Sequence, residues 1–138
     1  MNKMTIINRL KNLKTIDIEI MSKRQEIVSL RSKVLKSPQF TNMPKGTHFG
    51  NATEKLNLQI IDDTDRINKE IAELYSERQI LIRAIDSLDN NLERNVIRLY
   101  YLNNYTWLEI SRQLNWSIRQ LQRFKDNGVA KLEKILVN

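Results

Sequence analysis

The chain has 138 residues, of which 41% are hydrophobic, with three glycines, two prolines and no cysteine. This composition favours one all-α domain or two small ones, and the lack of cysteine excludes disulfides and thiolate metal sites. No apolar run approaches the ~18 residues of a membrane span, and no apolar signal core precedes a cleavage site, so we expect a cytoplasmic protein without a membrane partner.

The net charge of +7 is unevenly distributed along the chain. Residues 1–36 hold nine basic and three acidic residues, whereas residues 52–90 hold five basic and nine acidic ones. Residues 91–138 hold eight basic and four acidic residues, as a phosphate-binding surface would require. The opposite charges of the first and middle segments indicate that these two segments pack on each other.

The first predicted element is a long helix over residues 2–36. Its apolar residues recur every seven positions, at Ile6, Leu13, Ile20, Ile27 and Val34. This period indicates a coiled-coil seam. At ~1.5 Å per residue, the helix would be roughly 50 Å long, which is too long for a single small core.

Residues 37–51 are predicted to form a loop, because both prolines and two of the three glycines fall there. Its apolar residues either pack back on the helices or form a partner-binding segment that orders on contact. His48 is the only histidine and has no neighbouring Cys, Asp or Glu. We interpret it as a solvated loop residue, neither a ligand nor a catalytic base.

A second long helix is predicted over residues 52–88, from two heptad rows at Ile60, Ile67, Leu74, Leu81, Leu88 and at Thr64, Ile71, Arg78, Ile85. The two long helices would form a hairpin within one chain or pair between chains, and the periodicity fits both. We expect a homodimer or higher homo-oligomer through these helices. Asp62, Asp63 and Asp65 are interpreted as a solvated helix face and not a metal site.

The natural domain boundary lies near residue 90, between a helical stalk (1–90) and a C-terminal domain (91–138). That domain is expected to begin with a helix over residues 92–103. Two capping-box patterns follow, Thr106 to Glu109 and Ser117 to Gln120, eleven residues apart. This spacing is typical of a helix-turn-helix.

Other features of residues 106–124 agree with a helix-turn-helix. Asn115 falls at the turn, where a left-handed residue is often needed. The residues expected to bury between the two helices are Ile110, Leu114, Trp116, Leu121 and Phe124, with Trp116 and Leu121 forming a hydrophobic staple. The second helix is expected to continue through Ile135 and not to stop at Asp126-Asn127-Gly128.

The exposed face of this second helix carries side chains that suit DNA: Arg119, Gln120, Gln122 and Arg123. Arginine pairs well with guanine and glutamine with adenine. Arg112, Lys125 and Lys131 are candidates for phosphate contacts.

Residues 92–136 resemble region four of bacterial sigma factors, on the skeleton VI.LYYL…T..EI…L..S..Q..R…A..KL. The whole layout is similar to phage-encoded transcription regulators of the ArpU/RinA kind. The resemblance implies that Ser117, Ile118, Arg119, Gln120, Gln122 and Arg123 contact bases and backbone. Ile118 departs from the polar or basic residue usual there, and suits a thymine methyl group instead.

The sequence thus predicts a DNA-binding transcription regulator, an activator of phage or mobile-element late genes, with double-stranded DNA as its partner. The alternative is a protein-interaction module that binds RNA polymerase, a sigma factor or another regulator without reading DNA. No cofactor and no enzymatic activity are expected, since the chain offers no glycine-rich phosphate loop and no paired catalytic carboxylates. The operator, the direction of regulation and a contact with RNA polymerase are left open.

Overall fold

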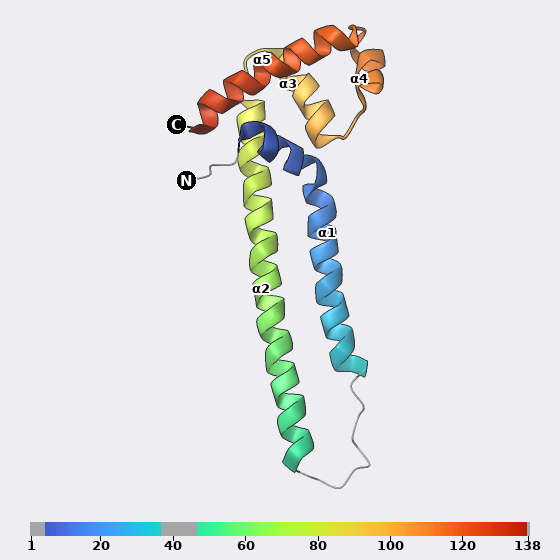
Figure 1. The fold of residues 1–138 in the computed structure, drawn as a ribbon, viewed down its shortest axis with the longest axis vertical. Helices are drawn as coiled ribbons and strands as arrows, with labels where there is room; N and C mark the ends of the chain where they lie inside the picture. The colour runs from blue at the N-terminus through green and yellow to red at the C-terminus, as the bar shows by residue number, and fades with distance from the viewer. Residues whose placement is uncertain (1–4, 37–46, 138) are drawn as a thin grey trace. The chain divides into compact units, whose positions relative to one another are not determined.

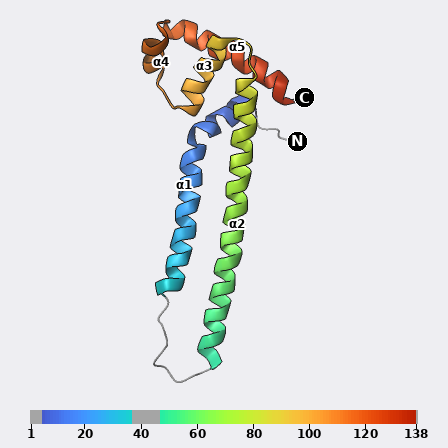
Figure 2. The ribbon, with the colours of Figure 1, turned by 180° about the vertical axis from the view of Figure 1, so that it is seen from behind.

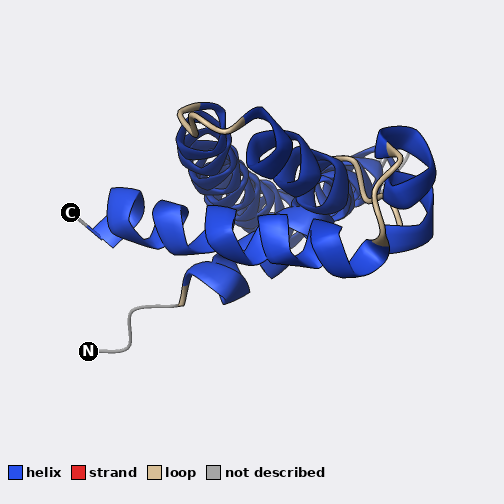
Figure 3. Ribbon diagram, turned by 90° about the horizontal axis from the view of Figure 1, so that it is seen from above, coloured by secondary structure: helices blue, strands red, loops and turns tan. Residues whose placement is uncertain are grey.

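The computed structural model describes residues 5–36 and 47–137, and side chains from 5–33 and 52–137. All elements in these ranges are helical, which confirms the all-α class (Figures 1 and 3). In chain order they are α1 (Ile6–Lys36), α2 (Thr47–Asp86), α3 (Asn91–Ile97), the π-helix η1 (Arg98–Leu102), α4 (Trp107–Leu114) and α5 (Ile118–Val137). None of the described helices is long and apolar enough to cross a membrane.

The break between the two long helices is shorter than predicted. Helix α2 begins at Thr47, so residues 47–51 are helical and the loop prediction is wrong for them. A glycine inside a helix costs only about 1 kcal/mol, which a helix of 40 residues outweighs at Gly50. His48 therefore lies on a helix and not in a loop, and its side chain lies outside the described residues, as do residues 37–46 with both prolines.

The chain divides into two compact units. The hairpin unit is Ile18–Tyr75, and the C-terminal unit comprises the described residues of Met1–Asp17 and Ser76–Asn138. In the hairpin unit, α1 and α2 lie side by side and run antiparallel (Figures 1 and 2). The predicted seam is buried between them at Ile20, Ile27, Ile60, Ile67 and Ile71.

Charged side chains border this seam. Lys23 Nζ lies 3.4 Å from Glu70 Oε1, which joins the basic α1 to the acidic α2 as their opposite charges predicted. The long helices therefore pair within one chain in the hairpin unit.

The C-terminal unit contains the beginning of α1 and the end of α2 together with all the later helices. Its core includes Leu10, Leu13 and Ile16 from α1, Leu81, Ala84, Ile85 and Leu88 around the end of α2, and Val96, Ile97, Tyr101, Ile110, Leu121, Val129 and Leu132. The predicted boundary near residue 90 falls in the connection between α2 and α3. Packing nevertheless continues across that connection.

Two arginines join the long helices within this unit. Arg9 donates two hydrogen bonds to the Glu77 carboxylate, at 3.0 and 2.6 Å. This hydrogen-bonded carboxylate raises the pKa of the Arg9 guanidinium. Arg78 occupies a seam position in the heptad pattern, and its Nε lies 3.1 Å from Asp17 Oδ1. This nitrogen is buried and has no hydrogen-bond partner among the described residues, so the Asp17 carboxylate neutralises the Arg78 charge beside the seam.

Helix α5 crosses α3 closely at Gly128, which is buried. A Cβ atom there would fall well inside contact distance of Ile97 Cδ1, and 3.4 Å from Glu93 Cβ. Beside this crossing, Lys131 Nζ lies 2.7 Å from Oε1 of Glu93, whose side chain is 6% exposed. The crossing and the ion pair together fix α5 on α3.

Candidate nucleic-acid interface

The first capping box forms as predicted at the start of α4. The Thr106 hydroxyl accepts a hydrogen bond from the Glu109 N–H at 3.2 Å. The Glu109 carboxylate in turn accepts from the Thr106 N–H at 3.3 Å. These reciprocal bonds satisfy backbone donors that a helix start otherwise leaves unpaired, and they fix where α4 begins.

The turn between α4 and α5 is closed by three short-range features. Asn115 adopts the predicted left-handed conformation, with φ 57° and ψ 39°. Its N–H donates to the Ser111 carbonyl at 2.9 Å. The Ser111 hydroxyl donates to the Trp116 carbonyl at 2.6 Å. Ser111 therefore contacts both sides of the turn and holds the angle between the two helices.

Helix α5 begins under a second cap. The Ser117 hydroxyl accepts from the Gln120 N–H at 3.2 Å, which is the serine half of the predicted second capping box. The first turn of α5 has no acidic residue. The partial positive charge of the helix N-terminus is therefore left for an incoming anion.

A small apolar core supports the α4–turn–α5 unit (residues 106–124). Val96, Ile110 and Leu121 are fully buried, and the partly buried side chains around them include Leu99, Tyr100, Tyr105, Trp107, Leu114 and Phe124. The prediction that Trp116 is buried is wrong, because it is 40% exposed and packs edge-on against Phe124, with ring centroids 5.2 Å apart. Leu121 fills the interhelical space, and Trp116 lies outside it on the turn.

The six candidate readers are all exposed on the first two turns of α5: Ser117, Ile118, Arg119, Gln120, Gln122 and Arg123. Leu121, between them in sequence, is fully buried and anchors the opposite side of the helix. Arg119 and Arg123 are four residues apart and so lie on one face, one turn from each other. Ile118 is 38% exposed, so it presents an apolar surface at the helix start.

The three candidate phosphate contacts have different surroundings. Arg112 is exposed in the last turn of α4. Lys125 lies 3.3 Å from Asp126 and 5.8 Å from the centre of the Trp107 ring. Lys131 already neutralises the buried Glu93, so its charge is used within the fold.

A stack of cations and rings supports α4, and no local signal predicts it. Lys14 Nζ lies 3.5 Å from the centre of the Tyr100 ring and donates to the Tyr100 carbonyl at 2.9 Å. Tyr100 stacks on Trp107, with centroids 4.3 Å apart, and Lys125 lies over the other ring of this pair. Burial lowers the pKa of the Lys14 ammonium. The stack connects residues 86 positions apart in the chain.

The connection into α4 contains a π-helical turn that the sequence did not reveal. The Asn103 N–H donates to the Arg98 carbonyl five residues earlier, at 3.0 Å. Asn104 then takes a left-handed conformation with φ 58°, and its side-chain amide donates to the Lys14 carbonyl at 3.0 Å. This wide turn brings the end of η1 against α1 and directs the chain into Thr106.

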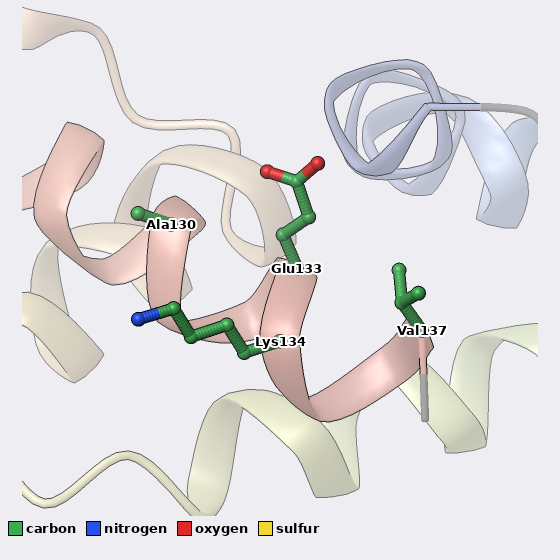
Figure 4. A pocket seen from close by; sticks show the side chains of 4 residues that line it. All are labelled: Ala130, Glu133, Lys134 and Val137. Atoms are coloured by element: carbon green, nitrogen blue, oxygen red, sulfur yellow. The ribbon is translucent and has the colours of Figure 1, made fainter.

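An open hollow lies against the last turns of α5, lined by Ala130, Glu133, Lys134 and Val137 (Figure 4). The Glu133 and Val137 side chains point toward the beginning of α1. The hollow offers one carboxylate and one ammonium. Over the described residues, no group of three or more His, Asp or Glu side chains is arranged to hold a metal ion.

Comparison with curated proteins gives no match, and comparison with solved structures gives none either. A family model, described as "Protein of unknown function (DUF1492)", matches residues 34–133. The match includes the end of α1, all of α2, α3, η1 and α4, and most of α5. Because this is well over half of the chain, the protein belongs to the DUF1492 family.

Proposed function

We propose that this protein is a sequence-specific DNA-binding transcription regulator, and that the first two turns of α5 enter the major groove. One observation carries the proposal: the α4–turn–α5 unit holds six exposed DNA-compatible side chains on a capped helix start whose first turn lacks acidic residues. A helix presented in this way matches the width of the major groove and the geometry of helix-turn-helix readers.

Each exposed side chain has a chemical counterpart on DNA. Arg119 and Arg123 would donate bidentate hydrogen bonds to guanine, and Gln120 and Gln122 would pair with adenine. Ile118 would contact a thymine methyl group. The N-terminus of α5, at Ser117, and the Arg112 side chain would bind phosphates, with the Lys125 side chain beside them.

Charge pairing supports the same face. Within the described side chains, Arg112, Arg119 and Arg123 have no ion-pair partner, whereas Lys125 and Lys131 each lie close to a carboxylate. A cation that is paired within the fold contributes less to phosphate binding, so the three arginines are the cations most available to DNA.

The biological role rests on the resemblances to sigma-factor region four and to phage regulators of the ArpU/RinA kind. They favour an activator of phage or mobile-element late genes. The competing hypothesis is a protein-interaction module that binds RNA polymerase, a sigma factor or another regulator. In that case α5 serves only to pack within the fold and does not contact DNA. The experiment below distinguishes the two.

The test begins with selection of a binding site from random duplex DNA by the full chain, followed by mobility shifts across a salt series. Arg119→Ala combined with Arg123→Ala should weaken binding to the selected site at least about 30-fold, since each bidentate contact contributes ~1–3 kcal/mol. A matched control, Arg83→Ala with Lys134→Ala, removes two exposed charges elsewhere and should change affinity less than about threefold.

Affinity of the wild-type chain should fall steeply with salt. Two results would overturn the proposal. One is the absence of any duplex binding at low salt, which favours the protein-interaction module. The other is specific binding that survives the arginine double substitution.

A further inference from the structure

The hairpin unit carries exposed apolar side chains on both of its helices. Ile18, Met21 and Val28 on α1, and Leu58 and Ile61 on α2, are each more than half exposed. The buried seam of the hairpin already accounts for a different set of residues. A second apolar surface on a two-helix unit therefore needs an explanation, because extended apolar patches commonly mark interaction sites.

On α1 this surface is a second heptad stripe. The spacing alternates three and four residues and the stripe contains no charge, at Ile18, Met21, Gln25, Val28 and Ser32. A surface helix ordinarily carries polar and charged residues on the side away from its core. An uncharged seam with this spacing is the pattern of a helix that packs against a further helix.

A contact between the two helices shows that the apolar residues of α1 and α2 share one side of the hairpin. The Arg24 guanidinium donates to the Tyr75 hydroxyl and lies 5.5 Å from the centre of its ring. On α1, Met21 lies three residues before Arg24, and Val28 lies four residues after it. On α2, Ile61 lies two heptads before Tyr75. Helical periodicity thus places them on the side marked by the Arg24–Tyr75 contact. We call this side, with Ile18 and Leu58 at its margin, the exposed hairpin face.

The charges of the two helices indicate what covers this face. From Ile18 to Lys33, α1 has four basic and two acidic residues, whereas from Ala52 to Tyr75, α2 has three basic and six acidic ones. In a second copy placed with its α1 over the first copy's α2, opposite charges meet. Contact of α1 with α1 would instead bring like charges together.

We infer that a second copy of this chain covers the exposed hairpin face, with each α1 antiparallel to the α2 of the other copy. The two hairpin units form a four-helix bundle around a two-fold axis parallel to the helices. Every neighbouring pair of helices in this bundle is antiparallel and of opposite charge. The assembly is isologous, so each contact occurs twice.

One charged pair fits this arrangement. Arg31 lies seven residues after Arg24 on α1, and Asp65 lies ten residues before Tyr75 on α2. Because the two helices are antiparallel, both residues lie two to three turns from the Arg24–Tyr75 contact in the same direction. Both are exposed, and neither has an ion-pair partner among the described side chains. The two-fold axis brings Arg31 of each copy to Asp65 of the other.

The first experiment measures the dimer dissociation constant of the full chain by analytical ultracentrifugation without DNA. Val28→Asp should raise this constant about 100-fold, because it puts a charge into the apolar contact twice. The matched control is Gln59→Asp, which adds the same charge on the opposite side of α2 from Ile61. It should change the constant less than about threefold.

The second experiment exchanges charges, with helicity of each variant checked by circular dichroism. Arg31→Glu and Asp65→Arg should each raise the dissociation constant roughly tenfold, and the combined variant should return it close to the wild-type value. Wild-type chain that remains monomeric at all concentrations overturns the inference, as does a dimer that tolerates Val28→Asp. A combined variant without recovery overturns the α1–α2 pairing.

Dimerisation through this face does not depend on DNA binding. The Arg119→Ala, Arg123→Ala variant should therefore dimerise like wild type. The two proposals can accordingly fail separately.

Discussion

The close crossing of α3 and α5 at Gly128 leads to a quantitative prediction. Gly128→Ala places a methyl group inside contact distance of Ile97 Cδ1, in a region where Ile97 is fully buried. The remaining nearest atoms, Glu93 Cβ at 3.4 Å and Ile97 Cγ1 at 3.5 Å, are at ordinary contact distance. The steric conflict is therefore confined to one terminal methyl group.

The expected magnitude follows from two opposing terms. Overpacking of a tight core costs ~1–3 kcal/mol. Replacing glycine by alanine inside a helix gains about 1 kcal/mol. Gly128→Ala should thus lower the free energy of unfolding by about 1 kcal/mol. Ile97→Val removes the conflicting methyl group and alone costs about 1 kcal/mol.

The double variant separates steric conflict from general disruption. With valine at position 97, the new alanine methyl group occupies vacated space, so Gly128→Ala should become stabilising by up to about 1 kcal/mol. The coupling between the two substitutions is then about 2 kcal/mol. Urea denaturation followed by tryptophan fluorescence is the appropriate measurement, because Trp107 and Trp116 both belong to the C-terminal unit.

Asn127→Ala is the matched control for helix propensity, since this neighbouring helical residue is exposed. It should be neutral or slightly stabilising in both backgrounds. Additive effects of Ile97→Val and Gly128→Ala would refute the account of the crossing. A large loss from Gly128→Ala that persists in the valine background would do the same.

Three further changes test other parts of the C-terminal unit. Thr106→Ala removes the capping box with Glu109 and should lower the free energy of unfolding by about 1 kcal/mol, measured by urea denaturation. Lys131→Ala leaves the buried Glu93 carboxylate unpaired and should lower the free energy of unfolding by roughly 2 kcal/mol. This is less than for a fully buried ion pair, because the lysine is half exposed. Adding Glu93→Gln to the same chain should recover part of this loss. Burial raises the pKa of the Tyr101 phenol above its usual 10.0, so the folded state keeps this proton longer than the unfolded state. Stability should therefore fall as the pH rises above about 10, and Tyr101→Phe should make the fall shallower in denaturation at several pH values.

The parts of the fold that sequence reasoning predicted well depend on residues close together in the chain. The Thr106–Glu109 capping box needs only a three-residue spacing, and the left-handed Asn115 is a property of one residue. The heptad rows predicted the buried seam because a repeating pattern specifies one helix face without knowledge of the partner. Continuation of α5 past Asp126-Asn127-Gly128 was predicted on the same ground and is confirmed.

The features that sequence reasoning missed depend on contacts between distant residues. Lys14 binds the Tyr100 carbonyl only because α1 passes beside η1, and nothing near either residue signals this contact. Trp116 is exposed because Leu121 fills the space between the helices, and their hydrophobicity alone does not rank them. The prolines and glycines of residues 37–51 predicted a loop for the whole segment, but Gly50 lies inside α2, where the long helix outweighs its low helix propensity.

Among the described side chains of the C-terminal unit, some cations are paired within the fold, and others are exposed and unpaired. The last third of the chain is basic by composition, but composition does not distinguish cations that stabilise the fold from cations that are free. Lys131 neutralises Glu93 beside the α3–α5 crossing, and Arg98 lies 2.6 Å from Asp86 at the end of α2. Removing such cations would affect stability first and DNA affinity little. Leu121 anchors one side of α5, and Arg119 and Arg123 are exposed on the other side. Removing these two arginines should therefore lower DNA affinity and leave stability unchanged. Measuring both quantities for both classes of variant therefore tests whether the α4–turn–α5 unit reads DNA or only packs.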